Sequence, residues 1–572
     1  MVFASLLSLN DDVLFEIFSL LDSKEALAMA YASKRAYQLA ISHVFTSLHW
    51  SRDMYGFVPE NDSSEAYAMW EYMRAPEALS QVPRVQHLHH FVTEFFQLVD
   101  VPLLHQLLSH ASNLRTIELW NFESFVEEDK ESLTRAIGVM RYLKQARLVS
   151  IAFETIFLLP TMFSSSNIAS LHLDLADSYD EPNHTPELAA LISVLGSLPS
   201  IHTFTVDFNR VPVLPNAFRT PDGSLPSIHH LSLICSSAVA ATFVTLCPNL
   251  LTLSLWLYGE NPIFSLGDDD RWPTDLKELI IRSHAVVATD TTRRMGHVDS
   301  VSLGCDMASL SGPEVLDLLP LLEATRPFAL KLQMDPVLTE PEHVWKSLSG
   351  AAPHLRSLEV TAEMCNVRDY VVCPPVLHFR AHANPPAPHD QDPLLPALHA
   401  SSLAHLTLHF PPAHPCSMAE VDYRRAAEVR RVEALLPLPQ QLVAAAASLR
   451  LVALRCCRPG SRSFDNLQEC ADRVPTLFEH FAAKHAREDE DERRWGSTSE
   501  FVRPALRKLR ELREDVPRDE RWWWVEGEGA ARRPVEIWRE DGERARALIE
   551  RADFDAARSL DGFYSSKCRY ER

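Results

Sequence analysis

The chain has 572 residues, of which 46% are hydrophobic and 23% are charged, so it is long enough for several domains and too apolar to be disordered throughout. Its formal net charge of −22 argues against a broad nucleic-acid-binding surface, because neutralising phosphates requires a basic surface. Glycine is scarce, at 16 residues, which argues against glycine-rich phosphate-binding loops.

The cysteines and the N-terminus bear on the cellular compartment. The ten cysteines are scattered without a CxxC pair, which fits reduced thiols better than the disulfide framework of short secreted chains. The opening MVFASLLSLNDDV lacks the basic region of a signal peptide, and no stretch of about 18 uninterrupted apolar residues occurs. We therefore expect a cytoplasmic or nuclear protein that binds neither membranes nor nucleic acid.

Residues 9–45 predict three short helices. Asn10 can cap the first helix, and Ser33 can cap the third. The first helix carries an apolar stripe at helical spacing, formed by Val13, Leu14, Ile17, Phe18 and Leu21. Helices this short bury too little surface to be stable alone, and their apolar excess predicts a docking face.

This segment resembles an F-box. The family pattern is matched in register from Leu9 to Leu27, and SKRAY at 33–37 matches its last part. The main departure from the family pattern is Asn10, where the family has proline. We expect this asparagine to preserve the fold but to lower the affinity for the adaptor that the family binds. The resemblance implies binding of a Skp-type adaptor through Leu9, Val13, Leu14, Ile17, Phe18, Leu21 and Leu27. The alternative is an unrelated amphipathic three-helix start.

A short strand pattern, aliphatic-x-x-aliphatic-x-aliphatic, recurs through residues 85–457. Clear copies are NLRTIELW, NIASLHLDL, NLLTLSLWL and SLAHLTLHF, mostly spaced 21 to 33 residues from the next copy, with apolar helical stretches such as PELAALISVLGSL between them. A strand and a helix in each short repeat are typical of a leucine-rich-repeat solenoid. The family's asparagine is missing, so we expect an irregular horseshoe. The alternative is a doubly wound α/β domain.

The positions between the apolar ones of each strand predict the target-binding surface. They project from one face of the sheet and carry polar and aromatic side chains, which suit a protein partner. The candidate target contacts are Trp120, Asp174, Asp207, Trp256 and Glu359. The acidity of this region predicts a target with a Lys/Arg-rich segment. The alternative is a solvated face without a partner.

Residues 458–572 differ in composition from the rest of the chain. They hold 24 Lys+Arg and 26 Asp+Glu, and five of the 11 tryptophans. VEGEG predicts a hairpin turn between two aromatic strands, and GERARALIERADFDAAR predicts a helix. We interpret this region as a charged, Trp-rich α+β segment that is either a cap on the open end of the solenoid or a lineage-specific extension.

The sequence offers no catalytic motif. GxGxxG, GxxxxGK[ST], HExxH and GxSxG are all missing. His87 and His89 share one face of a strand-like segment, but two histidines without further ligands do not make a zinc site. We therefore predict no catalytic residue, no metal and no cofactor.

Together these patterns predict an α/β protein with an F-box at 1–48, a linking helical segment at 49–84, the solenoid at 85–457 and the extension at 458–572. The two resemblances imply a substrate-recognition subunit of an SCF-type cullin–RING ubiquitin ligase, with a Skp-type adaptor, a cullin and an unknown target protein as partners. The chain resembles fungal proteins of this kind. The alternatives are a leucine-rich-repeat scaffold without a ligase role and, more distantly, an enzyme in the C-terminal region.

Overall fold

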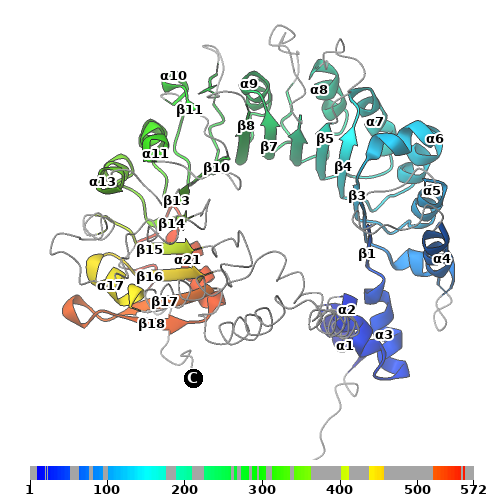
Figure 1. Cartoon of the computed structure of the whole chain (residues 1–572), viewed down its shortest axis with the longest axis horizontal. Coiled ribbons are helices and arrows are strands. Elements are labelled where there is room, and N and C mark those ends of the chain that lie inside the picture. The colour runs from blue at the N-terminus through cyan, green and yellow to red at the C-terminus, as the bar shows by residue number, and fades with distance from the viewer. Residues whose placement is uncertain are drawn as a thin grey trace, which may run out of the picture. The chain divides into compact units, whose positions relative to one another are not determined.

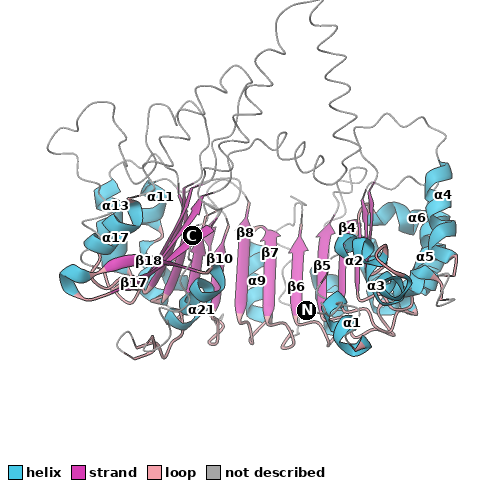
Figure 2. Ribbon diagram, turned by 90° about the horizontal axis from the view of Figure 1, so that it is seen from below, coloured by secondary structure: helices cyan, strands magenta, loops and turns pink. Residues whose placement is uncertain are grey.

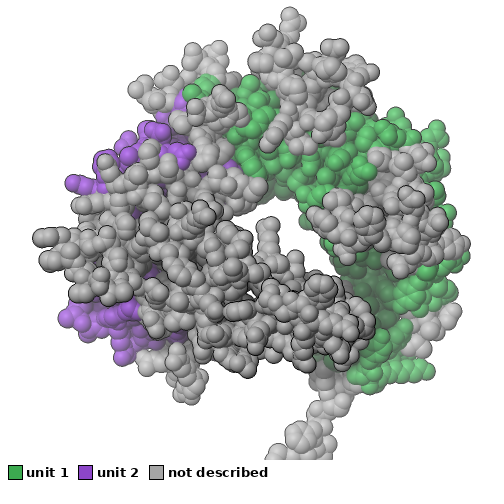
Figure 3. All heavy atoms as spheres, in the orientation of Figure 1, with its two compact units in different colours: residues 1–275 green, residues 276–572 purple. Residues whose placement is uncertain are grey.

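The structure is a computed structural model that falls into two compact units, Met1–Asp275 (unit 1) and Leu276–Arg572 (unit 2) (Figure 3). Leu9, one of the predicted adaptor contacts, lies outside the described residues. The structure describes residues 10–19, 21, 23–51, 63–76, 82–94, 101–175, 188–208, 224–258, 263–266, 272–282, 286–292, 295–304, 312–334, 341–362, 398, 401–410, 437–456, 520–555 and 558–560.

Unit 1 begins with the three predicted helices, α1 (Asp11–Ser19), α2 (Ser23–Ala30) and α3 (Lys34–Val44) (Figure 1). Ser33 caps α3 as predicted, since its hydroxyl accepts a hydrogen bond of 3.1 Å from the backbone N–H of Ala36. The three helices enclose a small apolar core of their own, formed by Leu14, Phe18, Ala26, Ala30, Leu39 and Ala40.

The rest of unit 1 is a parallel sheet in which each strand lies next to the strand that precedes it in the chain. The strands are β1 (Ser47–Ser51), β2 (His90–Glu94), β3 (Thr116–Leu119), β4 (Gln145–Ile151), β5 (Ser170–Leu175), β6 (Thr203–Asp207), β7 (His230–Cys235) and β8 (Thr252–Leu257). The short β9 (Ile263–Phe264) follows β8 in the chain but is not a strand of this sheet. The helical segments between them are α4 (Ser63–Arg74), η2 (Arg84–His87), α5 (Val101–His110), α6 (Phe122–Gly138), η4 (Phe153–Leu158), α7 (Leu159–Met162), α8 (Leu188–Gly196) and α9 (Ser237–Leu246).

Residue alternation decides which face of this sheet is covered. In β5 and β6 every second side chain is buried, and the strands pair so that Leu171 lies beside Phe204 and Leu173 beside Val206. Helices α5 to α9 lie along the face that these apolar rows supply (Figures 1 and 2). We call the opposite face, with its polar rows, the strand face of unit 1, and we use the same name for the corresponding face of the sheet of unit 2.

Unit 2 continues the same construction with β10 (Glu278–Ile281), β12 (Ser300–Leu303), β13 (Ala329–Met334), β14 (Ser357–Ala362), β15 (His405–Phe410) and β16 (Leu451–Cys456), which pair in parallel in this order. Its helices on the apolar side of the sheet are α11 (Gly312–Asp317), α12 (Leu319–Thr325), α13 (Pro341–Ala351) and α17 (Leu438–Ala445). The short elements β11 (Val286–Val287) and α10 (Thr289–Thr292) follow β10.

The C-terminal part of unit 2 changes strand direction. β17 (Glu520–Glu526) pairs antiparallel with β16, and β18 (Arg533–Ile537) pairs antiparallel with β17. The hairpin predicted at VEGEG is therefore present, with the short helix η7 (Gly529–Ala531) in its turn. Gly527 allows the turn, because it has a φ of +81° and a Cβ there would lie 2.5 Å from the carbonyl oxygen of Ala531. Helix α21 (Arg539–Ile549) overlaps the helix predicted at 542–558, but it begins three residues earlier and ends at Ile549.

The sequence prediction of an α/β fold with a long, mostly parallel sheet is thus confirmed. The four quoted strand copies lie in β3, β5, β8 and β15. The predicted linking helix is α4, and the described part of the linking segment also includes most of strand β1.

Candidate functional site

The three N-terminal helices leave some apolar side chains on the outside of their core. Leu14 and Phe18 are completely buried, whereas Ile17 and Leu21 are partly buried against them. The exposed fractions of Val13 and Leu27 are 46% and 39%. A further exposed side chain was not predicted from the sequence: Tyr31, in the turn after α2, is 82% exposed. The three exposed apolar side chains of these helices, Val13, Leu27 and Tyr31, are together called the helical docking surface below.

The N-terminal helices connect directly to the sheet of unit 1. β1 begins three residues after α3, and the carbonyl of Thr46 accepts backbone hydrogen bonds of 2.9 Å from both His89 and His90. Arg84 of η2 adds a second link, because its guanidinium lies 5.8 Å from the ring centroid of Phe45, directly after α3, and 4.3 Å from that of Tyr72 on α4. The helical docking surface is therefore attached to the sheet through paired backbone rather than through a linker alone.

On the strand face of unit 1, three side chains near one end of the sheet form a connected polar group. Glu118 Oε1 accepts hydrogen bonds from Trp120 Nε1 at 2.7 Å and from Arg147 at 3.0 Å. The guanidinium of Arg147 also lies 5.2 Å from the ring centroid of Trp120. The carboxylate of Glu118 is thus engaged by its own neighbours.

Four of the predicted target contacts come together in one row across this face. The register places Asp174 beside Asp207, with Val149 before them and Ile234 and Trp256 after them, and Trp120 directly follows the aligned Leu119. We call this set the Trp–Asp row; its members in strand order are Trp120, Val149, Asp174, Asp207, Ile234 and Trp256. All except the buried Val149 are partly exposed.

Burial and the charges on this face shift the pKa of two groups. Burial, reinforced by the charge of Asp207, raises the pKa of Asp174 to about 6, while Arg147 opposes the shift. Burial lowers the pKa of His172 to about 4, with Arg147 adding to the effect and Glu118 opposing it. At neutral pH the imidazole of His172 is therefore uncharged, and Asp174 is harder to ionise than an exposed aspartate.

The fifth predicted target contact, Glu359, has a different environment. It is 8% exposed, and its carboxylate pairs with Arg455 on β16 and with Arg546 on α21, the latter at 2.9 Å. Because two arginines already engage this carboxylate, Glu359 stabilises the C-terminal part of unit 2 and leaves little surface for a target. The alternation of polar and apolar residues correctly predicted the face of the sheet on which Glu359 lies, but it could not show that α21 covers that face.

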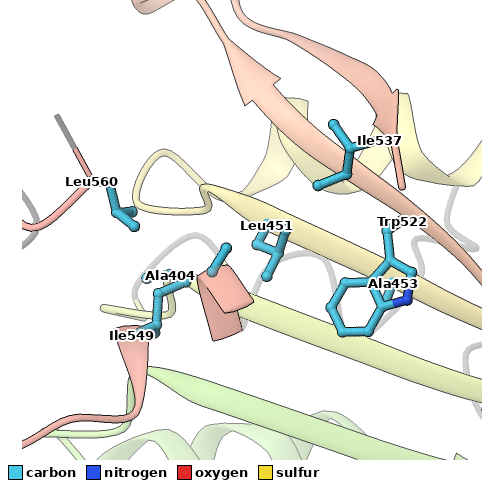
Figure 4. Packing of buried hydrophobic residues seen from close by; sticks show 8 residues of the cluster. Ala404, Leu451, Ala453, Trp522, Ile537, Ile549 and Leu560 are labelled. Atoms are coloured by element: carbon cyan, nitrogen blue, oxygen red, sulfur yellow. The ribbon is translucent and has the colours of Figure 1, made fainter. Parts of the chain in front are cut away.

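The covering of this part of unit 2 is extensive. The core cluster joins Leu451 and Ala453 of β16 to Ala545 and Ile549 of α21 (Figure 4). His405 is completely buried, hydrogen-bonded to Ser357 and Thr407, and stacked on Trp522 with ring centroids 5.8 Å apart. Burial keeps the pKa of His405 well below its ordinary value, so the imidazole is a neutral structural group.

Comparison with known families identifies the N-terminal helices. Residues 6–48 match the F-box domain. This confirms the family predicted from the register between Leu9 and Leu27. The comparison with curated proteins found no match to the chain.

The F-box implies an adaptor role in ubiquitin ligation through binding of a Skp-type adaptor, and F-box proteins are typically non-catalytic. The helical docking surface belongs to this F-box, where Val13 and Leu27 are exposed while Leu14 and Phe18 hold its helices together. In the described part of the chain, no group of three or more His, Cys, Asp or Glu side chains is placed to hold a metal ion. Within those same residues, no helix has both the length and the apolarity to cross a membrane.

Proposed function

We propose that the chain is the substrate-recognition subunit of an SCF-type cullin–RING ubiquitin ligase. The F-box binds the Skp-type adaptor, and the repeats, which we assign to an irregular leucine-rich-repeat solenoid, bind the target. The observation that carries this proposal is the backbone pairing that joins the F-box to the sheet, since Thr46 accepts from both His89 and His90. A docking module fixed to a recognition surface can hold one protein at a defined distance from another.

The assignment to leucine-rich repeats rests on how each repeat contributes apolar side chains to the core. Strands of four to seven residues pair in parallel and in chain order, and each contributes aliphatic side chains to continuous buried rows. A single repeat of this kind cannot bury its apolar face alone, so the stacking of neighbouring repeats provides the stability. The antiparallel β17 and α21 then form the cap that the open end of a solenoid requires.

The proposed role needs no catalytic group on this chain. Binding a target beside a charged ubiquitin-conjugating enzyme raises the effective concentration of the target's lysines, and this alone speeds transfer. A cytoplasmic or nuclear location, where such ligases operate, is part of the proposal.

The adaptor step is tested by affinity purification of the full chain from cells, with adaptor and cullin quantified in the eluate. Val13→Glu combined with Leu27→Glu places charge on the helical docking surface and should abolish recovery of both proteins. Val139→Glu is the matched control, because Val139 is similarly exposed, at 51%, but lies outside the F-box. Recovery of neither protein with the wild-type chain, or full recovery with the double variant, would overturn the proposal.

A further inference from the structure

The residues directly before the strands of unit 1 form a row along one edge of the sheet. The parallel strands point the same way, so their first residues lie side by side (Figure 2). Backbone hydrogen bonds join neighbours in this row, for example at 2.8 Å from the N–H of Lys144 to the carbonyl of Arg115. In strand order the row consists of His89, Arg115, Lys144, Ala169, His202, His229 and Leu251. We call its basic members, His89, Arg115, Lys144, His202 and His229, the basic rim.

The turns that lead into these strands carry no acidic residue. Residues 84–89, 110–115, 139–144, 163–169, 197–202, 224–229 and 247–251 are all described, and none of them is aspartate or glutamate. Arg141 adds another exposed cation shortly before Lys144. The basic rim and the two aspartates of the Trp–Asp row therefore lie towards opposite ends of the same sheet's strands.

The arginine and the lysine of the basic rim are unpaired within the described residues. Both Arg115 and Lys144 are exposed, and no carboxylate of the described part of the chain lies within ion-pair distance of either. Arg147 on the strand face differs, because it already pairs with a carboxylate at 3.0 Å. Towards the other end of the rim, the ring centroids of His202 and His229 lie 5.6 Å apart, so one group of a partner can contact both imidazoles.

The corresponding row of unit 2 shows how such an edge binds a peptide segment. Arg356, directly before β14, donates a hydrogen bond of 2.8 Å to the carbonyl of Arg551. Its guanidinium also lies 5.6 Å from the ring centroid of Phe554. Both contacts come from the segment after α21, which is neither helix nor strand. An arginine in this row therefore holds an irregular peptide segment by donating to one of its oxygen atoms.

The length and the donors of the basic rim fit a short acidic segment in extended conformation. His89 and His229 precede β2 and β7, so the rim spans about 24 Å at a strand spacing of about 4.8 Å. About seven residues of extended chain cover this distance at about 3.3 Å each. Arginine, lysine and histidine side chains donate hydrogen bonds, and ionised carboxylates only accept them, so acidic side chains complement every member of the rim.

Local charge, rather than the net charge of the chain, decides what the basic rim binds. Interactions between exposed charges are largely screened beyond about 8 Å at physiological ionic strength. The net charge of −22 opposes a long polyanion such as a nucleic acid, because most of its phosphates would lie outside the rim. A short acidic segment of a protein keeps its charges next to the rim.

We propose that the basic rim binds an extended, acidic segment of the target protein. Carboxylates at one end of this segment pair with Arg115 and Lys144, and a carboxylate at the other end accepts hydrogen bonds from His202 and His229. The segment is opposite in sign to the Lys/Arg-rich one that the overall acidity of the chain predicts. This inference rests on the proposed function, since it specifies the class of target segment.

The test measures binding of a fluorescent peptide to the purified full chain at low salt. The probe is a peptide of about ten residues in which glutamate alternates with serine or glycine. Arg115→Glu with Lys144→Glu should weaken its binding roughly tenfold or more. Lys130→Glu with Arg135→Glu is the matched control, because it also reverses two exposed positive charges, which lie on α6. This control should weaken binding far less.

Two other probes separate an acidic peptide from other ligands. The same peptide with glutamine in place of every glutamate should not bind, and a single-stranded oligonucleotide of equal net charge should bind more weakly than the glutamate peptide. Equal affinity of the rim variant and the control, undiminished binding of the glutamine peptide, or tighter binding of the oligonucleotide would overturn the inference.

Adaptor binding is measured on the same samples, and its retention shows that the variants are folded. A wild-type chain that binds the adaptor but not the glutamate peptide refutes this inference alone. A wild-type chain that fails to bind the adaptor refutes the proposed function.

Discussion

Arg546 on α21 pairs with Glu359 on β14 at 2.9 Å, and both side chains are almost buried, with exposed fractions of 14% and 11%. This pair fastens the C-terminal helix to the strand face of unit 2. Arg546 also contacts Glu550 on its own helix, and Glu359 also contacts Arg455, so the pair belongs to a network that spans β14, β16 and α21.

Removing the arginine of this network should be costly. Arg546→Ala leaves a nearly buried carboxylate with one partner fewer, and we expect a loss of about 3 kcal/mol in the free energy of unfolding. Arg544→Ala on the same helix is the control, because Arg544 is 64% exposed and its pair with Asp541 is a surface pair worth under about 1 kcal/mol. Urea unfolding of the three proteins measures both effects. Equal stability of the two variants would show that α21 is not anchored through Arg546.

The approach of α21 to the hairpin depends on a glycine. A Cβ added at Gly542 would lie 2.4 Å from ring atoms of Trp522, so Gly542→Ala should destabilise the protein by about 1–3 kcal/mol. Gly350→Ala in α13 is the matched control, since nothing lies within 4 Å of its added Cβ. Gly350→Ala should leave the free energy of unfolding unchanged or raise it by up to about 1 kcal/mol, because alanine favours a helix more than glycine does. Thermal unfolding that ranks the two variants in the opposite order would contradict this packing.

The paired carboxylates predict a pH-dependent effect on stability. The native pKa of Asp174 is raised to about 6, by burial and by Asp207 against the opposing charge of Arg147, so ionising Asp174 costs the native state free energy as pH rises from about 4 to 6. Asp174→Asn removes this cost. It should stabilise the protein by on the order of 1 kcal/mol at pH 7.5, after allowance for solvent screening, and by almost nothing near pH 4.

Urea titrations at both pH values, with Glu131→Gln as the control, measure this difference. A stabilisation that is the same at both pH values would rule out the carboxylate repulsion as its cause.

Buried and exposed residues of the F-box should behave differently. Leu14→Ala removes a fully buried side chain and should destabilise the helices by about 2–5 kcal/mol, with adaptor binding lost as a consequence. Val13→Ala leaves the core intact and should lower adaptor affinity without changing the thermal transition. Titration calorimetry together with circular dichroism separates these outcomes. Unchanged adaptor binding by Leu14→Ala would show that the helical core does not support the docking surface.

The sequence predicted local features well. Alternation placed Asp174 and Asp207 on one face, the F-box register predicted the N-terminal helices, and Gly527 marked the hairpin turn. These features depend on neighbouring residues, so a pattern of a few positions is enough to reveal them.

Long-range packing was not predictable in the same way. Ser357 and Glu550 are 193 residues apart in the chain, and nothing in either segment shows that α21 lies on β14. The sequence therefore predicted that Glu359 contacts a target, whereas in the structure its carboxylate pairs with Arg455 and Arg546 of the same chain. Likewise, periodicity gave the apolar stripe of α1 but could not tell that Leu14 lies inside the core while Val13 lies outside it.

The most direct test of the account is reconstitution of the purified full chain with a purified Skp-type adaptor and cullin, followed by light scattering on the eluted complex. The account predicts a single species that contains one copy of each protein, and Val13→Glu with Leu27→Glu should separate the chain from the other two. A wild-type chain that elutes apart from the adaptor under all salt conditions would contradict the claim that this F-box links the repeat surface to a ubiquitin ligase.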